Sequence, residues 1–310
     1  MKIFHNYFNA IEKKYENLSL ALGFFDGVHT GHKKVIENCV KRANENNIKS
    51  ALLTFTNHPR CIINKQEPKY ILDFQSRLKH IERLNVDYCF VYDFNNYFLN
   101  LDYCDYLKNI LIDNFHPKFI TTGFNHYFGK NRIGTCEKLK INEQRFGYIY
   151  NKIEPFKLDN EIVSSSLIRE KLSTGDVEKA NRMLSYNFYI EGKIIEGKKL
   201  GRTIDFPTAN FLYKKNIIQI PYGVYAVIVN IDGKEYQGVL NFGLRPTVNE
   251  KDKEPLCEVH ILNFDKNIYK QDIKVELIKK IRNEIKFKSI NDLKNQIDSD
   301  INFACKILKK

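Results

Sequence analysis

The first 185 residues of the chain alternate between short apolar runs and longer amphipathic stretches. The apolar runs have the length of strands and occupy residues 18–22, 51–55, 86–92, 118–122 and 148–152. The amphipathic stretches repeat with the period of a helix and occupy residues 33–46, 75–84, 102–114 and 136–146. This alternation predicts an α/β fold, a parallel doubly wound sheet with flanking helices. Ligands of such sheets bind beyond the carboxyl ends of the strands.

The pattern changes near residue 185, after a last expected helix at residues 176–184. Turn-rich sequence with apolar β runs follows, at residues 189–196, 223–231, 234–240, 257–262 and 273–278. These runs predict a small antiparallel barrel or sandwich, and the apolar spacing over residues 289–308 predicts a closing C-terminal helix. We therefore expect two domains, residues 1–185 and residues 186–310.

Composition narrows the class of protein. The net charge is +12, but the basic excess is +6 in residues 1–185 and +6 again in residues 186–310. An excess spread so evenly is not a basic patch, so we expect no nucleic-acid partner. No apolar run has the length of a membrane span and the N-terminus has no apolar signal region, so we expect a cytoplasmic protein with no membrane partner. The seven scattered cysteines include no Cys-x-x-Cys pair and predict neither a disulfide framework nor a zinc site.

A Gly-rich segment with two histidines follows the first apolar run. Residues 23–32 read Gly-Phe-Phe-Asp-Gly-Val-His-Thr-Gly-His, and helical periodicity begins directly after them. A strand, a Gly-rich turn and a helix start present backbone N–H groups and a positive dipole end to phosphate. His29 and His32 add imidazoles at the same point. This combination predicts chemistry at a phosphorus atom of a nucleotide.

Three further segments accompany this turn at the ends of later elements. They are Thr-Phe-Thr-Asn-His-Pro at 54–59, Gly-Phe-Asn-His-Tyr-Phe-Gly at 123–129 and Val-Ser-Ser-Ser-Leu-Ile-Arg at 163–169. Together with residues 23–32 they resemble the His-x-Gly-His nucleotidyltransferases, and in detail the FMN adenylyltransferase half of bacterial FAD synthetases. The resemblance implies a Rossmann-like nucleotidyltransferase domain that uses ATP.

The resemblance also implies roles for individual residues of the first domain. His29 and His32 would bind the ATP phosphates and stabilise charge on the α-phosphorus, with Gly23, Phe24 and Asp26 beside them. Ser164, Ser165 and Arg169 would hold the phosphates that leave as pyrophosphate. Asn125 would lie in the flavin region. Positioning and electrostatics would supply most of the catalysis.

Some of these residues have a structural alternative. Asp26 either caps the turn or contacts ATP, and the sequence favours neither. Ser164–Ser166 could cap a helix, which is compatible with phosphate binding because both uses employ the same N–H groups. His58 is expected to support the site rather than act in it. His126 and Tyr127 depart from the family pattern Gly-x-Asp-Phe-x-Phe-Gly, so the local contacts there are open.

The second domain opens on another Gly-rich segment. Residues 197–210 read Gly-Lys-Lys-Leu-Gly-Arg-Thr-Ile-Asp-Phe-Pro-Thr-Ala-Asn and resemble the corresponding stretch of riboflavin kinases. Gly197 and Gly201 would let the backbone approach ATP closely, and Arg202 would add charge nearby. Thr208 and Asn210 are hard oxygen donors suited to Mg²⁺, and the resemblance gives them that role.

The resemblance continues through residues 222–225, 238–247, 257–264 and 281–287. It implies that Glu258 is the general base that takes the proton from the ribityl 5′-hydroxyl of riboflavin. It places Asn241 and Arg282 in contact with the flavin. Asp205 stands where many relatives have glycine, which predicts a stiffer flap over ATP.

The sequence therefore predicts a bifunctional enzyme. The C-terminal β-barrel domain would phosphorylate riboflavin to FMN, and the N-terminal domain would adenylylate FMN to FAD with release of pyrophosphate, each with Mg²⁺ and ATP. One alternative retains only the kinase, with a degenerate N-terminal half. Another is a basic flavin- or RNA-binding regulator, for which the sequence shows no localised charge patch and no RNA-recognition motif.

Overall fold

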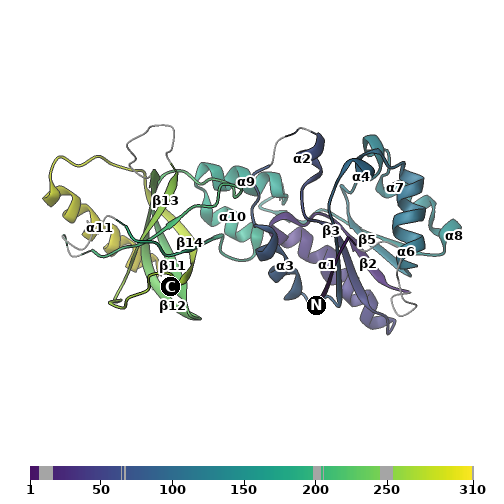
Figure 1. Cartoon of the computed structure of the whole chain (residues 1–310), viewed down its shortest axis with the longest axis horizontal. Helices are drawn as coiled ribbons and strands as arrows, with labels where there is room; N and C mark the ends of the chain where they lie inside the picture. The colour runs from purple at the N-terminus through teal and green to yellow at the C-terminus, as the bar shows by residue number, and fades with distance from the viewer. Residues whose placement is uncertain are drawn as a thin grey trace. The chain divides into compact units, whose positions relative to one another are not determined.

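The structure is a computed structural model that describes residues 1–6, 17–63, 65, 68–197, 204, 206–244 and 254–308. The chain divides into two compact units, Met1–Ser165 and Ser166–Lys310 (Figure 1). The domain boundary expected at about residue 185 stays a prediction. In the structure the helix expected at 176–184 belongs to the second unit.

The first unit is built on a parallel sheet of six strands in the order β1-β4-β3-β2-β5-β6. The five apolar runs of the first half all form strands, which confirms that part of the prediction. The sequence did not predict β1, because it lies at the sheet edge and its residues are mostly exposed. The strands are β1 (Lys2–His5), β2 (Ser19–Leu22), β3 (Ser50–Phe55), β4 (Tyr88–Tyr92), β5 (Phe119–Gly123) and β6 (Ile149–Ile153).

The helices expected between these strands are also present. The stretch at 102–114 continues from α5 through a π-helical segment, η3, into α6, and the stretch at 136–146 is interrupted between α7 and α8. The helical elements are η2 (Asp26–Val28), α1 (Thr30–Glu45), α2 (Pro59–Ile63), α3 (Phe74–Glu82), α4 (Asn96–Asn100), α5 (Tyr103–Asp105), η3 (Tyr106–Ile112), α6 (Asp113–Phe115), η4 (Lys130–Arg132), α7 (Cys136–Ile141) and α8 (Glu143–Phe146). A short hairpin, β7 (Lys157–Leu158) and β8 (Glu161–Ile162), follows β6.

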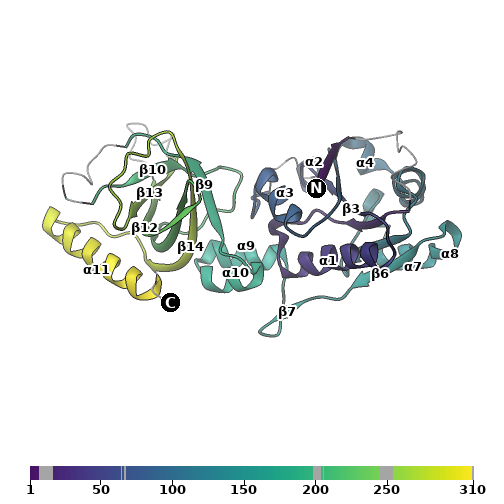
Figure 2. The ribbon, with the colours of Figure 1, turned by 90° about the horizontal axis from the view of Figure 1, so that it is seen from below.

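Both faces of the parallel sheet are buried under helices, which explains why its strands are apolar at nearly every position. On β2, Leu20 and Leu22 join a core cluster with Leu107 of η3. Ala21, between them, joins a separate cluster with Ile36 and other residues of α1 and α3. Figure 2 shows α1 lying lengthwise along the unit.

The strand order places β2 at the point where the chain changes direction across the sheet. From β2 the chain adds β3 and β4 on one side, and it then returns to add β5 and β6 on the other. Open α/β sheets bind ligands at such a switch point, outside the carboxyl ends of the strands. The segments after β2 and after β5 both begin there.

The second unit contains an antiparallel sheet of six strands in the order β10-β13-β12-β11-β14-β9. The N–H of Ile195, just beyond β9, donates to the carbonyl oxygen of Asn210 in β10 at 2.8 Å, so the first and last strands meet. This closure confirms the barrel. Its elements are α9 (Ser165–Thr174), α10 (Val177–Leu184), β9 (Tyr189–Lys193), β10 (Ala209–Leu212), β11 (Gly223–Ile231), β12 (Lys234–Leu244), β13 (Pro255–Ile261), β14 (Asp272–Arg282) and α11 (Ile290–Leu308).

Side chains from one face of the strands fill the interior of the barrel, and α11 covers part of the outer face. Tyr225, Leu240 and Phe242 are fully buried on the inner face. Val224 and Ala226 alternate with them and pack on the outer face against α11, through residues that include Ala304. Figure 2 shows α11 running beside the barrel strands. The expected closing helix is therefore confirmed.

Gly223, at the start of β11, provides a test of this packing. It has a φ of 151°, and a Cβ on it would overlap the carbonyl oxygen of Arg282 on the paired strand. Gly233 also has a positive φ, 74°, but nothing lies within 4 Å of its Cβ position. We expect Gly223→Ala to lower the free energy of unfolding by about 3 kcal/mol or more. The matched change Gly233→Ala should cost about 1 kcal/mol.

Urea unfolding monitored by circular dichroism measures the free energy of unfolding of both variants. If the two losses of stability were equal, the close approach between Gly223 and β14 would be wrong.

Candidate functional site

The turn after β2 holds a backbone conformation that most residues avoid. Phe25 has a φ of 58°, Gly27 of 76° and Val28 of 38°. Glycine adopts such angles freely, but a β-branched valine does so only when its surroundings hold it there. Backbone strain of this kind occurs mostly at functional sites.

Hydrogen bonds from other segments hold this turn in place. The carbonyl oxygen of Phe24 accepts from Nη1 of Arg77 at 2.7 Å and from Oγ1 of Thr54 at 3.2 Å. The Ser165 hydroxyl, at the start of α9, donates to the carbonyl oxygen of Asp26 at 2.9 Å. Two of the accompanying segments found in the sequence, 54–59 and 163–169, thus reach the turn through their own side chains.

The Asp26 side chain fastens a further loop to the turn. Its carboxylate is 3% exposed and accepts from the backbone N–H groups of Ile71, at 3.0 Å, and Leu72, at 3.4 Å. Gly27 lies against the same loop, since a Cβ on it would approach the Ile71 side chain to 2.9 Å. The structure therefore gives Asp26 a structural role, and its contact with ATP stays a prediction.

His29 and His32 form a stacked pair at the start of α1. Nδ1 of His29 accepts the N–H of His32 at 3.3 Å and so caps the helix. This bond places the proton of a neutral His29 ring on Nε2. The two ring centroids lie 3.6 Å apart with the planes inclined by 19°.

Glycines make room for this arrangement of rings. A Cβ on Gly31 would lie 3.1 Å from the His29 ring, and a Cβ on Gly23 would lie 2.7 Å from the Phe25 ring. The Phe25 and His32 rings in turn form a T-shaped pair with their centroids 5.5 Å apart. The pattern Gly-x-x-x-x-x-His-x-Gly-His therefore has a steric basis as well as a chemical one.

These groups suit a polyphosphate ligand. The N-terminus of α1 brings the positive end of a helix dipole to the turn. Beside it lie the His29 imidazole and the Ser165 segment. Ser164 is half-buried in the same segment. Arg169 belongs to the second unit, so its expected contact with the same ligand stays a prediction.

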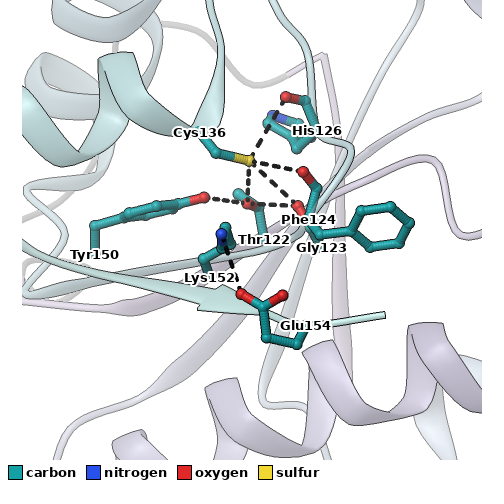
Figure 3. Close-up of polar contacts among 8 residues, drawn as sticks. All are labelled: Thr122, Gly123, Phe124, His126, Cys136, Tyr150, Lys152 and Glu154. Atoms are coloured by element: carbon teal, nitrogen blue, oxygen red, sulfur yellow. Dashed lines mark hydrogen bonds and ion pairs between the residues drawn. The ribbon is translucent and has the colours of Figure 1, made fainter. Parts of the chain in front are cut away.

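The segment after β5, which carries Asn125, is anchored by a buried thiol. Sγ of Cys136, at the start of α7, lies 3.5 Å from the carbonyl oxygen of Gly123, 3.4 Å from that of Phe124 and 3.8 Å from that of His126 (Figure 3). Oγ1 of Thr122, on β5, makes a 2.7 Å hydrogen bond with the hydroxyl of Tyr150 on β6. The backbone around Asn125 is thus fixed from one side while the Asn125 side chain remains exposed.

The residues that depart from the family pattern have separate roles. Burial lowers the pKa of His126 to about 4, so its ring is neutral at pH 7, and it stacks on Phe128 with the centroids 5.9 Å apart. Tyr127 is exposed and lies under the guanidinium of Arg132 at 4.3 Å. His126 therefore packs within the segment, and Tyr127 and Arg132 present an aromatic and a cationic group at its surface.

In the second unit the expected site residues lie in one row across the barrel. Asn210 on β10 pairs with Glu258 on β13, and Glu258 pairs with Asn241 on β12. Directly paired residues of antiparallel strands point to the same face. The same row continues through Val224 on β11 to Arg282 on β14. This row lies on the outer face, because the alternating neighbours Phe211, Cys257 and Phe242 are buried inside.

Close contacts order the polar end of this row. Nδ2 of Asn241 donates to Oε2 of Glu258 at 3.2 Å, which orients the carboxylate. Nδ2 of Asn210 donates to the Thr208 hydroxyl at 3.2 Å. A Cβ on Gly197 would lie 2.8 Å from the Asn210 amide, so a larger residue there would have to displace this side chain. The structure thus brings Gly197, Thr208, Asn210, Glu258 and Asn241 together.

Arg282 is held by the C-terminal helix. Its Nε and Nη2 donate to the carboxylate of Asp300 on α11 at 3.0 and 2.8 Å, and Asp300 is 3% exposed. Nη1 donates to the carbonyl oxygen of Asn283 at 2.9 Å. Arg282 therefore joins β14 to α11, and its contact with flavin stays a prediction.

Three residues that the sequence singled out, Gly201, Arg202 and Asp205, lie outside the described residues. The sequence gave no role to Arg77, although it contacts the first site through Phe24. The one feature of the sequence that could have indicated its importance is its position beside Leu78 and Ile81 on the apolar side of α3. An arginine there is unusual because charged side chains are rarely fully buried.

Comparison with known proteins identifies relatives for both units. A family model described as FAD synthetase matches residues 11–167, and one described as riboflavin kinase matches residues 184–308. A bifunctional riboflavin kinase/FMN adenylyltransferase of Haemophilus influenzae is 38% identical, with 93% of this chain and 94% of that protein covered. Proteins with the same name in Bacillus subtilis and Escherichia coli K12 are 36% and 30% identical, over 94% and 97% of this chain and 93% and 96% of theirs.

A solved structure is similar over almost the whole chain. It belongs to a protein of Streptococcus pneumoniae described as a macrolide-efflux protein, with a TM-score of 0.87, 26% sequence identity and coverage of 98% of this chain and 99% of that one. We take from it a shared fold and no transport activity. In the part of the chain that the structure describes, no helix has the length and apolar character needed to cross a membrane.

Proposed function

Because this chain belongs to the family of bifunctional riboflavin kinases/FMN adenylyltransferases, we propose that each unit holds one of the two active sites. The first unit adenylylates FMN to FAD, and the second phosphorylates riboflavin to FMN. The observation that carries this proposal is that each family match contains its own converging set of side chains. These sets are the turn with His29 and His32, and the row with Asn210, Glu258 and Asn241.

In the first unit, the turn at residues 23–32 binds the phosphates of ATP. A phosphate oxygen of FMN attacks the α-phosphorus, and the bond to the β,γ-phosphates breaks to release pyrophosphate. His29 and His32 donate hydrogen bonds to the oxygens on which charge develops. Ser164, Ser165 and Arg169 hold the leaving phosphates, and Asn125 contacts the flavin. No protein nucleophile is needed, since alignment of the two reactants lowers the barrier.

In the second unit, Glu258 accepts the proton of the ribityl 5′-hydroxyl as that oxygen attacks the γ-phosphorus of ATP. The bond from the γ-phosphorus to the bridging oxygen breaks, and ADP leaves. Asn241 keeps the carboxylate oriented through its hydrogen bond. A general base must lie within hydrogen-bond reach of the proton it takes, and a strand position in a closed barrel gives it a rigid support. Gly197 leaves room for the Asn210 side chain beside the ATP phosphates.

The donors beside Glu258 fit Mg²⁺. Thr208 offers a hydroxyl oxygen, Asn210 an amide oxygen and Glu258 a carboxylate in one neighbourhood, and hard oxygen donors of this kind suit the ion. Asn210 uses its amide nitrogen toward Thr208, and no donor among the described residues engages its Oδ1. Thr208 and Asn210 would therefore hold Mg²⁺, which would neutralise charge on the phosphates. The cytoplasmic location and the absence of nucleic-acid and membrane partners stay predictions.

Replacement of His29 tests the first site. We expect His29→Ala to lower the rate of FAD formation from FMN by about 100-fold or more, because a donor to the reacting phosphate is lost. Riboflavin phosphorylation should continue, so FMN accumulates. Chromatography of flavins after incubation with Mg-ATP measures both. His116→Asn serves as the control, because His116 is exposed and precedes the amino end of β5, whereas the site lies beyond the carboxyl ends of the strands. Loss of both activities in His29→Ala would show that the two sites are not independent.

Replacement of Glu258 tests the second site. Glu258→Gln removes the basic oxygen but keeps an amide oxygen that can accept from Asn241. We expect riboflavin phosphorylation to fall by about 100-fold or more, while FAD formation from supplied FMN stays unchanged. Glu235→Gln, at an exposed position of β12, is the matched control. Near wild-type phosphorylation by Glu258→Gln would mean that another group takes the proton.

A further inference from the structure

Arg77 carries a positive charge into the interior of the first unit. It lies on α3 with 2% of its surface exposed. Its Nη1 donates to the carbonyl oxygen of Phe24 at 2.7 Å, and its Nη2 donates to that of Phe55 at 2.5 Å. The first carbonyl belongs to the turn after β2, and the second ends the neighbouring strand β3. One guanidinium therefore joins the carboxyl ends of two adjacent strands.

The flat face of the same guanidinium packs on aromatic rings. Its carbon lies 4.2 Å from the centroid of the Phe24 ring and 5.3 Å from that of Phe74. Phe24 is thus held at its main chain and at its ring. The Phe24 ring also contacts His58 and Tyr70, with ring centroids 4.8 and 5.9 Å away. Phe24 has little freedom to move while Arg77 is in place.

Burial of the Arg77 guanidinium costs free energy, because a charge is removed from water, and packing does not require a charged side chain at this position. Burial lowers the pKa of Arg77 to about 10, against the influence of the Asp26 carboxylate, so the side chain remains charged at pH 7. Its Nε is buried with no hydrogen-bond partner among the described residues. A long apolar side chain would fill the same space without desolvating a charge. What it could not do is bind two carbonyl oxygens at a fixed separation.

We infer that Arg77 is a positioning residue for adenylyl transfer. By joining the carbonyls of Phe24 and Phe55 it fixes the turn at 23–32 relative to the segment after β3, and so sets the shape of the site for ATP. The planar fork of arginine makes both bonds at once, whereas the single ammonium of lysine does not. This inference rests on the proposal that the turn binds ATP.

Two substitutions separate positioning from packing. Arg77→Met keeps a long side chain but removes every donor, and Arg77→Lys keeps the charge without the fork. We expect R77M to raise the KM for ATP in FAD formation by about tenfold or more, because two charged hydrogen bonds are lost, with a smaller rise in R77K. The KM for FMN and riboflavin phosphorylation by the same preparation should stay near wild type. Arg42→Met, a half-buried arginine in the last turn of α1, is the matched control and should leave the KM for ATP unchanged.

A lowered thermal midpoint with an unchanged KM for ATP in R77M would overturn the inference, because that is the result of a packing role alone. Should R77M show no cooperative unfolding, R77K decides the question: a raised KM for ATP supports the inference and an unchanged one overturns it. His29→Ala in the same assay separates the two claims. If it retains FAD formation, the proposed function fails. If it loses FAD formation while both Arg77 variants keep a wild-type KM for ATP, only the inference fails.

Discussion

The strained turn between β2 and α1 is the constraint around which the first unit is organised. Phe25 and Val28 stand at positive φ, and each such non-glycine residue costs roughly 1–3 kcal/mol. A single hydrogen bond contributes about 0.5–1.5 kcal/mol to stability, so one tether could not hold both residues. Arg77, Thr54, Ser165 and the loop at 71–72 together do so. The turn therefore has its shape without a ligand, so the phosphate binding proposed for it does not have to supply the energy of ordering it.

In the second unit, the backbone that carries the candidate site residues is held in place by strand pairing. Its polar residues stand on neighbouring strands of a closed barrel, and strand pairing places Asn210, Glu258 and Asn241 side by side. Their backbone is regular, and the hydrogen bonds between paired strands fix the positions of these side chains without contacts from distant segments. The two sites thus differ in what would damage them. We expect the first to be sensitive to loss of a side chain that holds the turn from another segment, such as Arg77. We expect the second to be sensitive to changes in the barrel, such as a Cβ at Gly223.

The sequence predicted most of the fold because apolar periodicity is a local signal. It did not predict β1, an exposed edge strand, or β10, a four-residue strand that includes the polar Asn210. Through ordered motifs it also selected residues that the structure brings together, which are His29 and His32 in the first unit and Asn210, Glu258 and Asn241 in the second. It could not decide whether Asp26 has a structural role or contacts ATP. The carboxylate accepts hydrogen bonds from the N–H groups of residues 71 and 72, which lie far along the chain. Arg77 was missed for the same reason, because its contacts to Phe24 and Phe55 exist only once the strands are paired.

The central claim is that one chain makes FMN at one site and converts it to FAD at another. The most direct measurement follows flavins and nucleotides together after the full chain is mixed with riboflavin and Mg-ATP. We expect FMN to rise and then fall as FAD accumulates, with ADP matching the riboflavin consumed and pyrophosphate matching the FAD formed. FAD that formed without pyrophosphate, or FMN that accumulated without conversion, would contradict the account.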